Sequence, residues 1–402
     1  MPSRPDASRF DHPNDALTAL AGKLRVVSSA PESTDPCGRV LCEAVVADRD
    51  SPAADVSAMD GYAIRMAHLG QPQVNVLGQA QAGAEPPSMP DAGVLRIFTG
   101  AVIPPGCEAV VKREDTIEGD GVISWREAAN KTTAGDHIRR QGENTPVGDQ
   151  VLASGVQLLP AQMATLANFG LVRPALLRAV RVSLITTGNE VHQDPDSVPM
   201  PWQLHNSNRH ATRAILQGKP WIEVVAVRHV DDRLDELVAT MKGCLQDSDA
   251  ILLTGGVSMG DYDLVPEAVE KLTAELSFHG LPVRPGKPIL GASTSDGKLI
   301  LGLPGNPVSA TIGCHRFAIP LLAKQSGQTN WLPPCPTVKL RDGGDRTLPL
   351  FAMRLVRLTQ DGIATIVPSK GSGDLISLGQ STGYVEVPPG QTGEGPWPYH
   401  AW

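Results

Sequence analysis

The spacing of apolar and polar residues changes several times along the chain, and each change predicts a different kind of element. Residues 14–27 (NDALTALAGKLRVV) place apolar side chains on one helical face, with Asn14 in position to cap the helix. Residues 35–47 (DPCGRVLCEAVVA) predict a second helical segment. Residues 160–170 (PAQMATLANFG) predict a short helix, because proline stands at its start and glycine at its end.

Two other stretches predict β-structure. Between residues 72 and 158, short runs rich in β-branched residues alternate with turn residues, which is typical of an all-β segment. These runs are VNVLG, VLRIFTG, EAVVKRED, GVISW and DQVLAS. After residue 327, the runs TVKLRD, FAMRLVRL, IATIVPS and YVEVPPG predict a small C-terminal β-barrel or sandwich.

Between these β-rich parts, residues 179–326 alternate apolar strands with helices of ten or more residues. Such alternation predicts βαβ units, that is, a parallel sheet covered by helices on both faces. The expected strands are VRVSLITTG, WIEVVAVRHV, AILLTGG, ELSFHGLPV and KLILGLPG. The predicted fold class is therefore a multidomain protein with a central α/β domain and separate β domains.

Composition excludes several classes of function. A chain of 402 residues has room for about two to four domains. The net charge of −8 argues against binding to nucleic acid, which needs a basic surface. No run of eighteen apolar residues predicts a membrane span, and the N-terminal residues lack the apolar core of a secretory signal. We therefore expect a cytoplasmic protein.

The cysteines predict no metal site and no disulfide framework. None of the six forms a C-x-x-C pair, so we expect reduced, buried thiols.

Glycines and carboxylates gather where each expected strand of the 179–326 segment ends. In an open α/β sheet, ligands bind outside the carboxyl ends of the strands, so these turns form the candidate site. They are TTGNE (186–190), RHVDD (228–232), TGGVSMGDYD (254–263), RPGKP (284–288) and LPGNPVS (303–309).

The LPGNPVS turn predicts an anion site. Gly305 allows a tight turn, Asn306 could cap the following helix, and Pro307 suits its first position. The free N–H groups of the first helical turn and the Ser309 hydroxyl would then face an anion. The alternative is a well-capped helix that binds nothing.

Four acids follow three of these strands: Glu190, Asp231, Asp261 and Asp263. Carboxylates repel an anion unless a cation bridges them, and Mg²⁺ takes oxygen ligands together with phosphate. The combination predicts a phosphorylated ligand bound through Mg²⁺. For a single acid, above all Asp231 or Asp232, the alternative is a helix cap or a solvated loop charge.

Three motifs lie earlier in the chain. SAMDGYAIR (57–65) is expected in a loop before the β segment, where Asp60 and Gly61 could form a tight turn. RIFTGAVIPPG and IRRQGENTPVGDQVL add the Thr99 hydroxyl and the cations Arg139 and Arg140, which have no evident local role.

Taken together, these motifs resemble the MoeA family, the molybdopterin molybdenumtransferases, which include the E domain of gephyrin. The resemblance covers nearly the whole chain, and the combination of SAMDGYA, GGVSMGDYD and GLPGNPVSA is highly specific. The motifs that carry it, all in family order, are DVSAMDGYA, RIFTGAVIPPG, IRRQGEN, TTGNE, the HVDD turn, TGGVSMGDYD, RPGKP, LPGNPVSA and GSGDL.

The resemblance implies an elongated homodimer whose subunits have four domains. Residues 1–50 and 140–176 would form a split elongated domain, and residues 51–139 a β-rich domain. Residues 177–327 would form a MogA-like α/β domain that binds molybdopterin, and residues 328–402 a C-terminal β-barrel.

The activity that the resemblance implies is the insertion of molybdenum into the dithiolene of molybdopterin. The substrates would be adenylylated molybdopterin and molybdate, the products molybdenum cofactor and AMP, and Mg²⁺ would promote the step. An adenylyltransferase and the apo-molybdoenzymes that receive the cofactor would be possible contacts.

The resemblance also assigns roles by position. Glu190 and Asp263 would hold the pterin and the metal-bridged phosphates, while Asp60 and Thr99 would reach across from the partner subunit. Molybdate is a dianion, so its site needs cations and hydroxyl donors. The catalytic group is Asp60, Thr99, Glu190, Asp231 and Asp263; the substrate-binding group is Arg139, Asn144, Gly255, Gly256, Ser258, Gly305 and Asn306; the molybdate-binding group is Arg284, Lys287, Ser309, Arg354 and Ser372.

The chain departs from the family pattern at three positions. Asn144 replaces the usual Asp of the arginine-rich turn, and Gly280, next to His279, stands where many members carry Lys. Arg284 replaces a frequent Lys and adds a fork that grips oxyanions bidentately.

Three hypotheses about function remain open. The first is an active molybdenum insertase, which the acids Asp60, Glu190 and Asp263 favour. The second is a binding or scaffold protein without turnover, or a variant that inserts tungstate, which Asn144 and Gly280 favour. The third, an unrelated nucleotide-binding α/β enzyme, leaves SAMDGYA unexplained.

Overall fold

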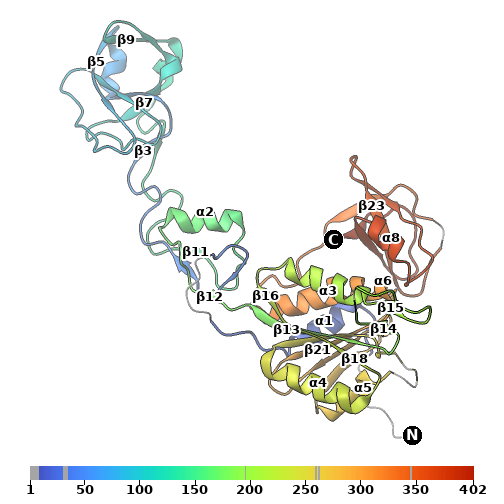
Figure 1. Cartoon of the computed structure of the whole chain (residues 1–402). Coiled ribbons are helices and arrows are strands. Elements are labelled where there is room, and N and C mark those ends of the chain that lie inside the picture. Colours follow the sequence, from blue (N-terminus) through green and yellow to red (C-terminus); the bar gives the residue numbers. More distant parts are fainter. Residues whose placement is uncertain (1–8, 30–34, 195, 259, 261–262, 345) are drawn as a thin grey trace. The chain divides into compact units, whose positions relative to one another are not determined.

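The computed structural model describes residues 9–29, 35–194, 196–258, 260, 263–344 and 346–402. Contacts between residues divide the chain into two compact units, each described separately below (Figure 1). The first unit contains the residues up to Glu43 together with Ser154–Met163 and Val172–Trp402. The second unit contains Ala44–Ala153 and Ala164–Leu171.

A six-stranded sheet forms the centre of the first unit, in the order β16-β13-β17-β21-β20-β18. Neighbouring strands pair in parallel from β16 to β21, whereas β20 pairs antiparallel with both of its neighbours. The predicted parallel sheet is therefore confirmed for the first four strands, and β20 is a strand that the sequence pattern missed. The bounds are β13 (Val180–Thr187), β16 (Ile222–Val230), β17 (Ala250–Thr254), β18 (Glu275–His279), β20 (Leu290–Ser293) and β21 (Leu299–Leu303).

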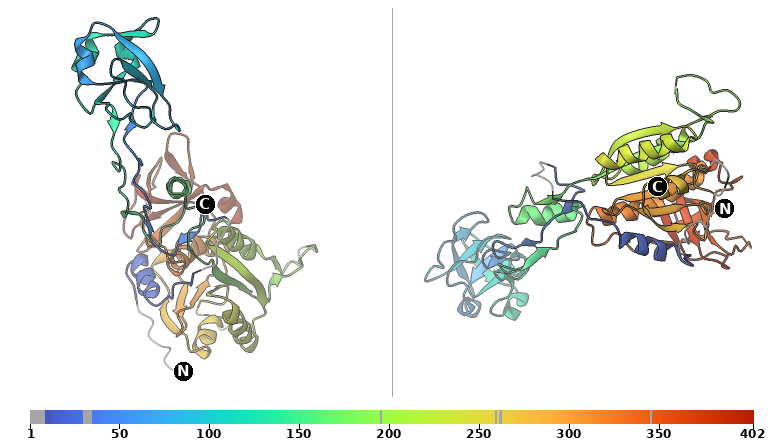
Figure 2. Two further views of the ribbon diagram at one scale, coloured as in Figure 1. Left: turned by 90° about the vertical axis from the view of Figure 1, so that its left-hand side faces the viewer. Right: turned by 90° about the horizontal axis from the view of Figure 1, so that it is seen from below.

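Helices cover both faces of this sheet, as predicted (Figures 1 and 2). The inner strands β13, β17 and β21 are buried almost throughout, which explains their continuous apolar sequences. One face carries α1 (Pro13–Ala21), α3 (Ser207–Gln217) and the continuous helical segment of α6 (Pro307–Gly313), the π-helical turn η4 (Cys314–Ala318) and α7 (Ile319–Gln325). The other face carries α4 (Leu234–Asp247) and α5 (Val265–Lys271).

The C-terminal part of the first unit is a closed barrel. Its strands follow the order β23-β24-β22-β26-β25, and β25 pairs again with β23 to close the ring. The apolar core on the α1 face continues into this part through Phe351, Met353 and Leu355. The bounds are β22 (Thr337–Leu340), β23 (Phe351–Leu358), β24 (Ile363–Ile366), β25 (Gly383–Val387) and β26 (Trp397–Ala401), and the short helix α8 (Leu375–Gln380) lies between β24 and β25 in sequence.

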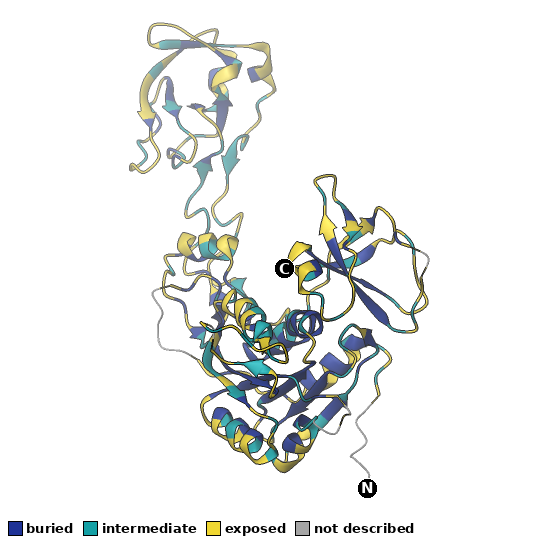
Figure 3. Cartoon of the chain, turned by 45° about the vertical axis from the view of Figure 1, so that its right-hand side comes forward, coloured by how far each residue is buried: buried dark blue, intermediate teal, exposed yellow. Residues whose placement is uncertain are grey.

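The second unit is built on a six-stranded sheet in the order β7-β4-β6-β5-β9-β8. Buried residues concentrate on its strands, as they do on the strands of the first unit (Figure 3). The bounds are β4 (Gly61–Ile64), β5 (Val74–Ala80), β6 (Val94–Ile97), β7 (Ala109–Lys112), β8 (Thr116–Glu118) and β9 (Val122–Trp125). Outside this sheet lie the two-residue strands β2 (Val45–Val46) and β3 (Val56–Ser57), which pair with β11 (Gln150–Leu152) and β10 (Ile138–Arg139), respectively.

Four predictions about helices, turns and strands were wrong. Residues 35–47 form β1 (Val40–Leu41) and β2 rather than a helix, because the backbone of this segment pairs with β12 (Leu176–Leu177) and β11. The first helix is capped by the ring of His12, which accepts the Asn14 N–H at 3.1 Å, and not by Asn14 itself. It ends at Ala21, before the predicted end at residue 27. Gly61 begins β4 inside the sheet instead of a turn in a preceding loop, since β4 pairs with β6 and β7.

The fourth wrong prediction concerns the RPGKP turn. Arg284 lies on β19 (Val283–Arg284), which pairs in parallel with β23 of the C-terminal part and not with the α/β sheet. The expected strand 275–283 is thus two strands, because the glycine at position 280 has a positive φ and redirects the chain. The helix α2 (Pro160–Asn168) is confirmed, whereas the finer division of the chain into four domains stays a prediction.

All six cysteines are free thiols, as expected, but only Cys244 and Cys314 are buried, so the prediction of buried thiols was wrong for the other four. None of the helices in the described residues is both long and apolar enough to cross a membrane.

Candidate functional site

The carboxyl ends of β13, β17 and β21 meet at a turn that only glycine fits. Gly255 has φ +97°, and a Cβ atom there would lie 2.6 Å from the Thr187 hydroxyl. Its N–H donates to the Leu303 carbonyl at 3.1 Å, which ties the end of β17 to the end of β21. The Gly256 carbonyl then accepts the Val265 N–H at the start of α5. The glycines thus leave backbone close to any ligand that lies over this edge.

The acids predicted at this edge lie around the same turns. The Glu190 carboxylate lies over Gly188, because a Cβ atom at Gly188 would be only 2.5 Å from Glu190 Oε2. Asp263 Oδ2 accepts the Gly260 N–H at 2.6 Å, and Asp231 follows β16 with a largely exposed side chain. Ser258, which follows the Gly255–Gly256 turn, is exposed, whereas Asp261 lies outside the described residues.

A polar network that no sequence motif predicted lies under this edge. Thr186 Oγ1 accepts the Asn206 side-chain N–H at 2.9 Å and lies 2.9 Å from His229 Nδ1. Burial lowers the pKa of His229, although the carboxylates of Asp231 and Asp232 act in the opposite direction. His229 is therefore neutral near pH 7, and its role is to hydrogen-bond rather than to carry charge.

Two buried hydroxyls were also missed. Thr187 and Thr254, the last residues of β13 and β17, have side-chain oxygens without a hydrogen-bond partner in the described part of the chain. Buried polar atoms usually find partners, so unpaired hydroxyls next to a glycine turn are candidates for contact with a ligand. The signal in the sequence was a polar residue at the end of each apolar strand, directly before the glycines.

The carboxylate oxygens at this edge could hold Mg²⁺ only if a bound substrate supplied further oxygen ligands. The carboxylates of Glu190 and Asp263 provide oxygen atoms, the atoms that Mg²⁺ prefers. Among the described residues, however, no three His, Cys, Asp or Glu side chains converge to hold a metal ion. Such an incomplete set suits an ion that one or two carboxylates share with substrate phosphates.

Replacing Gly255 with alanine is expected to destabilise the protein by about 1–3 kcal/mol and to weaken ligand binding at this edge. The added Cβ would collide with the Thr187 hydroxyl, and φ +97° is strained for any residue with a side chain. Urea unfolding measures the first effect. Gly379→Ala, on the open side of α8, is the matched control and should be neutral or slightly stabilising. A Gly255→Ala protein as stable as the wild type would contradict this account of the turn.

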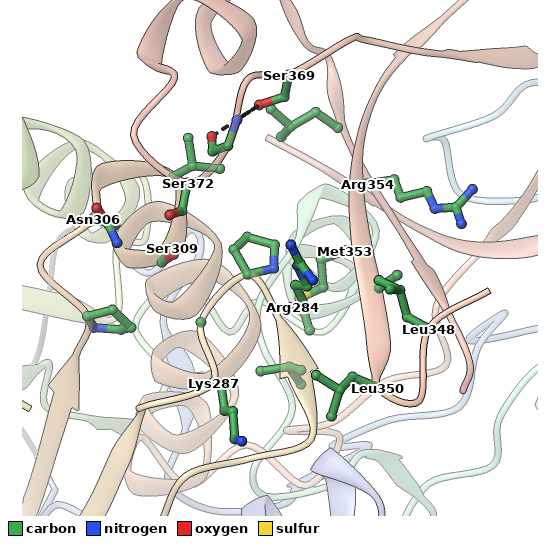
Figure 4. A pocket seen from close by; sticks show the side chains of 18 of the residues that line it. Arg284, Lys287, Asn306, Ser309, Leu348, Leu350, Met353, Arg354, Ser369 and Ser372 are labelled. Carbon is green, nitrogen blue, oxygen red and sulfur yellow. Dashed lines mark hydrogen bonds between the residues drawn. The ribbon is translucent and has the colours of Figure 1, made fainter. Parts of the chain in front are cut away.

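A cavity of about 860 Å³ lies in the same unit, between the RPGKP turn, the start of α6 and the strands of the barrel (Figure 4). All five residues of the predicted molybdate group line it, although they come from positions as far apart as 284 and 372. The lining polar residues are Arg284, Lys287, Asn306, Ser309, Arg346, Arg354, Ser369 and Ser372.

The loop that begins α6 joins this cavity to the glycine turn. A Cβ atom at Gly305 would lie 3.6 Å from Gly255 Cα, while the next residue, Asn306, lines the cavity. Asn306 occupies the N-cap position but makes no capping hydrogen bond with its side chain, so the predicted side-chain cap was wrong. Ser309 is buried on the first turn of α6, and the Val308 N–H donates to the Ser372 carbonyl at 3.0 Å.

Arg354 lines the cavity, but its guanidinium group is hydrogen-bonded to backbone carbonyls. Its Nη1 donates to the Gly343 carbonyl and its Nη2 to the Arg346 carbonyl, each at 2.7 Å. Figure 4 shows its guanidinium turned away from Arg284 and Ser309. His279, considered as a substitute for a cation at Gly280, hydrogen-bonds through Nε2 with the Val257 carbonyl at 2.7 Å.

The second unit brings the remaining candidate residues together as two pairs. Asp60 Oδ1 accepts both the backbone N–H and the hydroxyl of Thr99, each at 2.8 Å. The backbone hydrogen bond from Thr99 and the hydroxyl bond lower the pKa of Asp60. Arg139 donates to Glu143 at 2.5 Å and to the side-chain oxygen of Asn144 at 2.7 Å. Asn144 therefore keeps a hydrogen bond to Arg139 without adding a charge.

Comparisons with known proteins agree with this architecture. Residues 12–170 match the family described as the MoeA N-terminal region (domain I and II), and residues 183–324 match a probable molybdopterin binding domain. A crystal structure of a molybdopterin biosynthesis moeA protein from Pyrococcus horikoshii has a TM-score of 0.80 at 24% identity, covering 98% of this chain and 99% of that one. At this identity the match establishes the fold.

Sequence relatives define the family. The chain is 33% identical to a molybdopterin molybdenumtransferase of Synechococcus elongatus over 374 residues, which cover 88% of each chain. It is 32% identical to a protein of the same name from Staphylococcus aureus over 365 residues, covering 88% of this chain and 85% of the relative.

Fold and relatives together define a transferase of molybdenum cofactor biosynthesis. More particularly, the chain belongs to the molybdopterin molybdenumtransferase family.

Proposed function

We propose that this protein transfers molybdenum from molybdate to adenylylated molybdopterin and releases AMP, with the assistance of Mg²⁺. One observation carries the proposal: a single loop, 303–309, contacts the acid-rich glycine turn on one side and lines a basic cavity on the other. A reaction that joins a phosphorylated pterin to an oxyanion needs both kinds of site next to each other.

The two sites suit the two substrates on electrostatic grounds. The glycine turn supplies close backbone, and Glu190 and Asp263 would hold Mg²⁺, which would neutralise charge on the phosphates that link the pterin to AMP. The cavity supplies cations and serine hydroxyls, which suit a tetrahedral dianion such as molybdate. The chain's own residues thus orient the two substrates rather than react with them.

The second unit would serve the same reaction in a homodimer. We propose that Asp60 and Thr99, with Arg139 and Asn144, act on the substrate bound by the partner subunit. The two hydrogen bonds that Asp60 accepts from Thr99 keep its carboxylate ionised and fixed in direction, as a ligand-binding group requires. Cytoplasmic localisation belongs to the same proposal.

The test is AMP release from adenylylated molybdopterin by the purified protein, with molybdate and Mg²⁺ each omitted in turn. We expect release that depends on both components, because each occupies a separate part of the site. Tight binding of the adenylate without release under any condition would contradict the proposal and favour a binding or scaffold protein. Replacement of molybdate by tungstate in the same assay measures the preference between the two oxyanions.

A further inference from the structure

A second cavity, of about 610 Å³, lies in the first unit. None of the candidate site residues lines it, and it shares no lining residue with the 860 Å³ cavity. Its volume is in the range of about 300–1,000 Å³ that is usual for small-molecule sites. The lining residues come from the segments 155–159, 219–221, 315–323, 328–336 and 399–401.

The wall formed by residues 328–336 is held at both ends by backbone hydrogen bonds. The Thr329 N–H donates to the Gly155 carbonyl at 3.1 Å, and the Tyr399 N–H donates to the Pro336 carbonyl at 2.8 Å. The same segment contains three prolines, which restrict its backbone further. This wall is therefore formed before any ligand binds, which lowers the entropic cost of binding.

Aromatic side chains form much of the lining. Trp221 is 4% exposed, Tyr399 is also buried, and Trp331 is half-buried. Only 4% of the chain is aromatic, so this concentration around one cavity is not an average of the composition. Neither indole N–H has a hydrogen-bond partner within the described residues, and neither nitrogen is sealed from solvent. Both indoles can therefore offer an apolar face and a donor to a ligand.

Lys219 gives the cavity a positive charge that no acid balances. Its side chain is half-buried and has no ion-pair or hydrogen-bond partner in the described part of the chain, and no described Asp or Glu lines the cavity. Arg316 also lines it, but Arg316 is paired with Glu386 at 2.6 Å. Burial lowers the pKa of His315, another lining residue, to about 4, so this ring is neutral at pH 7. A partly buried cation without a counter-charge favours an anionic ligand.

We propose that this cavity binds a small planar aromatic anion, whose rings pack against Trp221 and Trp331 and whose anionic group pairs with Lys219. A neutral apolar ligand would leave Lys219 unpaired. An inorganic anion such as phosphate would leave the indole faces without apolar contact. The inference is independent of the proposed function, because no residue assigned to molybdopterin or molybdate lines this cavity.

Two fluorescent probes that differ by one group test the inference on the full-length protein. 8-Anilinonaphthalene-1-sulfonate carries an anion on the same aromatic rings as N-phenyl-1-naphthylamine, which is neutral. We expect one sulfonate to bind per chain. Lys219→Met should raise the Kd for the sulfonate about tenfold and leave the Kd for the neutral probe within about twofold, because only the ion pair is lost. Trp331→Ala should raise both Kd values, because both probes lose the same apolar contact.

Lys242→Met and Trp202→Ala are the matched controls. Both side chains are exposed and neither lines the cavity, so both variants should bind the probes as the wild type does. A thermal melt of each variant shows that the fold is intact. Equal affinity of the wild type and Lys219→Met for the sulfonate would overturn the inference, and so would equal losses in Lys219→Met and Lys242→Met.

The thiol of Cys335, which lines the cavity, locates the bound probe without any substitution. Alkylation by iodoacetamide, followed by mass spectrometry of the peptides, should be slower at Cys335 when the sulfonate is bound and unchanged at the exposed Cys37. An unchanged rate at Cys335 would show that the probe binds elsewhere. If Trp331→Ala lowered the mass measured by sedimentation and the probe bound only to dissociated chains, a second copy would cover the cavity and the inference would be wrong.

Discussion

Replacing Asp263 with asparagine is expected to lower the rate of AMP release by at least about 100-fold while the fold survives. That factor corresponds to about 2.7 kcal/mol of lost transition-state stabilisation, within the range that metal-assisted charge stabilisation supplies. The amide keeps an oxygen that accepts the Gly260 N–H, so the loop geometry is preserved and only the charge is lost. Steady-state AMP release and a thermal melt, measured on the same preparation, separate activity from stability.

The matched control for Asp263→Asn is Glu267→Gln on the following helix. Glu267 pairs with Lys271 at 3.9 Å on the exposed surface of α5, and its neutralisation should change the rate by less than about twofold. Unfolding of the Asp263→Asn protein at ordinary temperature would show that the carboxylate is structural. Full activity of the Asp263→Asn protein would show that the Asp263 carboxylate has no role in the reaction.

Glu386→Gln is expected to destabilise the protein by about 3–5 kcal/mol, the largest stability effect that the structure suggests. Glu386 Oε2 accepts from Arg316 Nε at 2.6 Å, and both side chains are almost completely buried, at 6% and 7% exposure. Arg316 also donates to the side chain of Asn14, so the pair joins α1, η4 and β25. Removing the carboxylate leaves a buried guanidinium without its counter-charge, which urea unfolding at pH 7 would measure.

The same ion pair predicts sensitivity to acid. Burial alone would raise the pKa of Glu386, but hydrogen bonds from His400 and the charge of Arg316 lower it to about 2, from an ordinary value of 4.5. A lowered pKa in the folded state means that the stabilisation is complete above pH 4.5 and is lost as the pH falls toward 2. The wild type should therefore lose stability between pH 4.5 and 2 by more than Glu386→Gln does.

A double variant distinguishes the effect of removing both charges from the effect of leaving one buried charge without its partner. Replacing both Arg316 and Glu386 with methionine removes the charges together and should restore most of the stability that Glu386→Gln loses. The exposed pair of Arg341 and Asp361 is the control, and Asp361→Asn should cost less than about 1 kcal/mol. If Glu386→Gln and Asp361→Asn lowered the free energy of unfolding equally, burial would not be the cause of the large effect expected at Glu386.

The sequence predicted the parts of the fold that local pattern determines. Buried parallel strands such as β13 and β17 have continuous apolar sequences, and the helices between them have helical periodicity, so the α/β sheet could be read directly. The pairing of Val283–Arg284 with the barrel could not be predicted from the sequence, because a two-residue strand acquires its partner only through tertiary contacts. The prediction of a helix at residues 35–47 was wrong for the same reason. Their apolar spacing suits a helix, but pairing with distant strands overrides this local preference.

The candidate site divides in the same way. Strand-end motifs indicated Gly255, Glu190 and Asp263 because parallel strands bring their carboxyl ends to one edge. No local pattern could show that Arg354 binds two backbone carbonyls or that Thr99 binds Asp60 across 39 positions of sequence. Side-chain direction and long-range pairing depend on the folded backbone, so they emerged only from the structure.

The most direct test of the central proposal is the ratio of molybdenum incorporated into the pterin to AMP released in a single turnover. Mass spectrometry of the pterin product and chromatography of the nucleotide give the two quantities from one reaction. We expect one molybdenum atom in the pterin for each AMP, with both products lost when molybdate is omitted. AMP released without molybdenum in the pterin would show a hydrolase of the adenylate and would contradict molybdenum insertion.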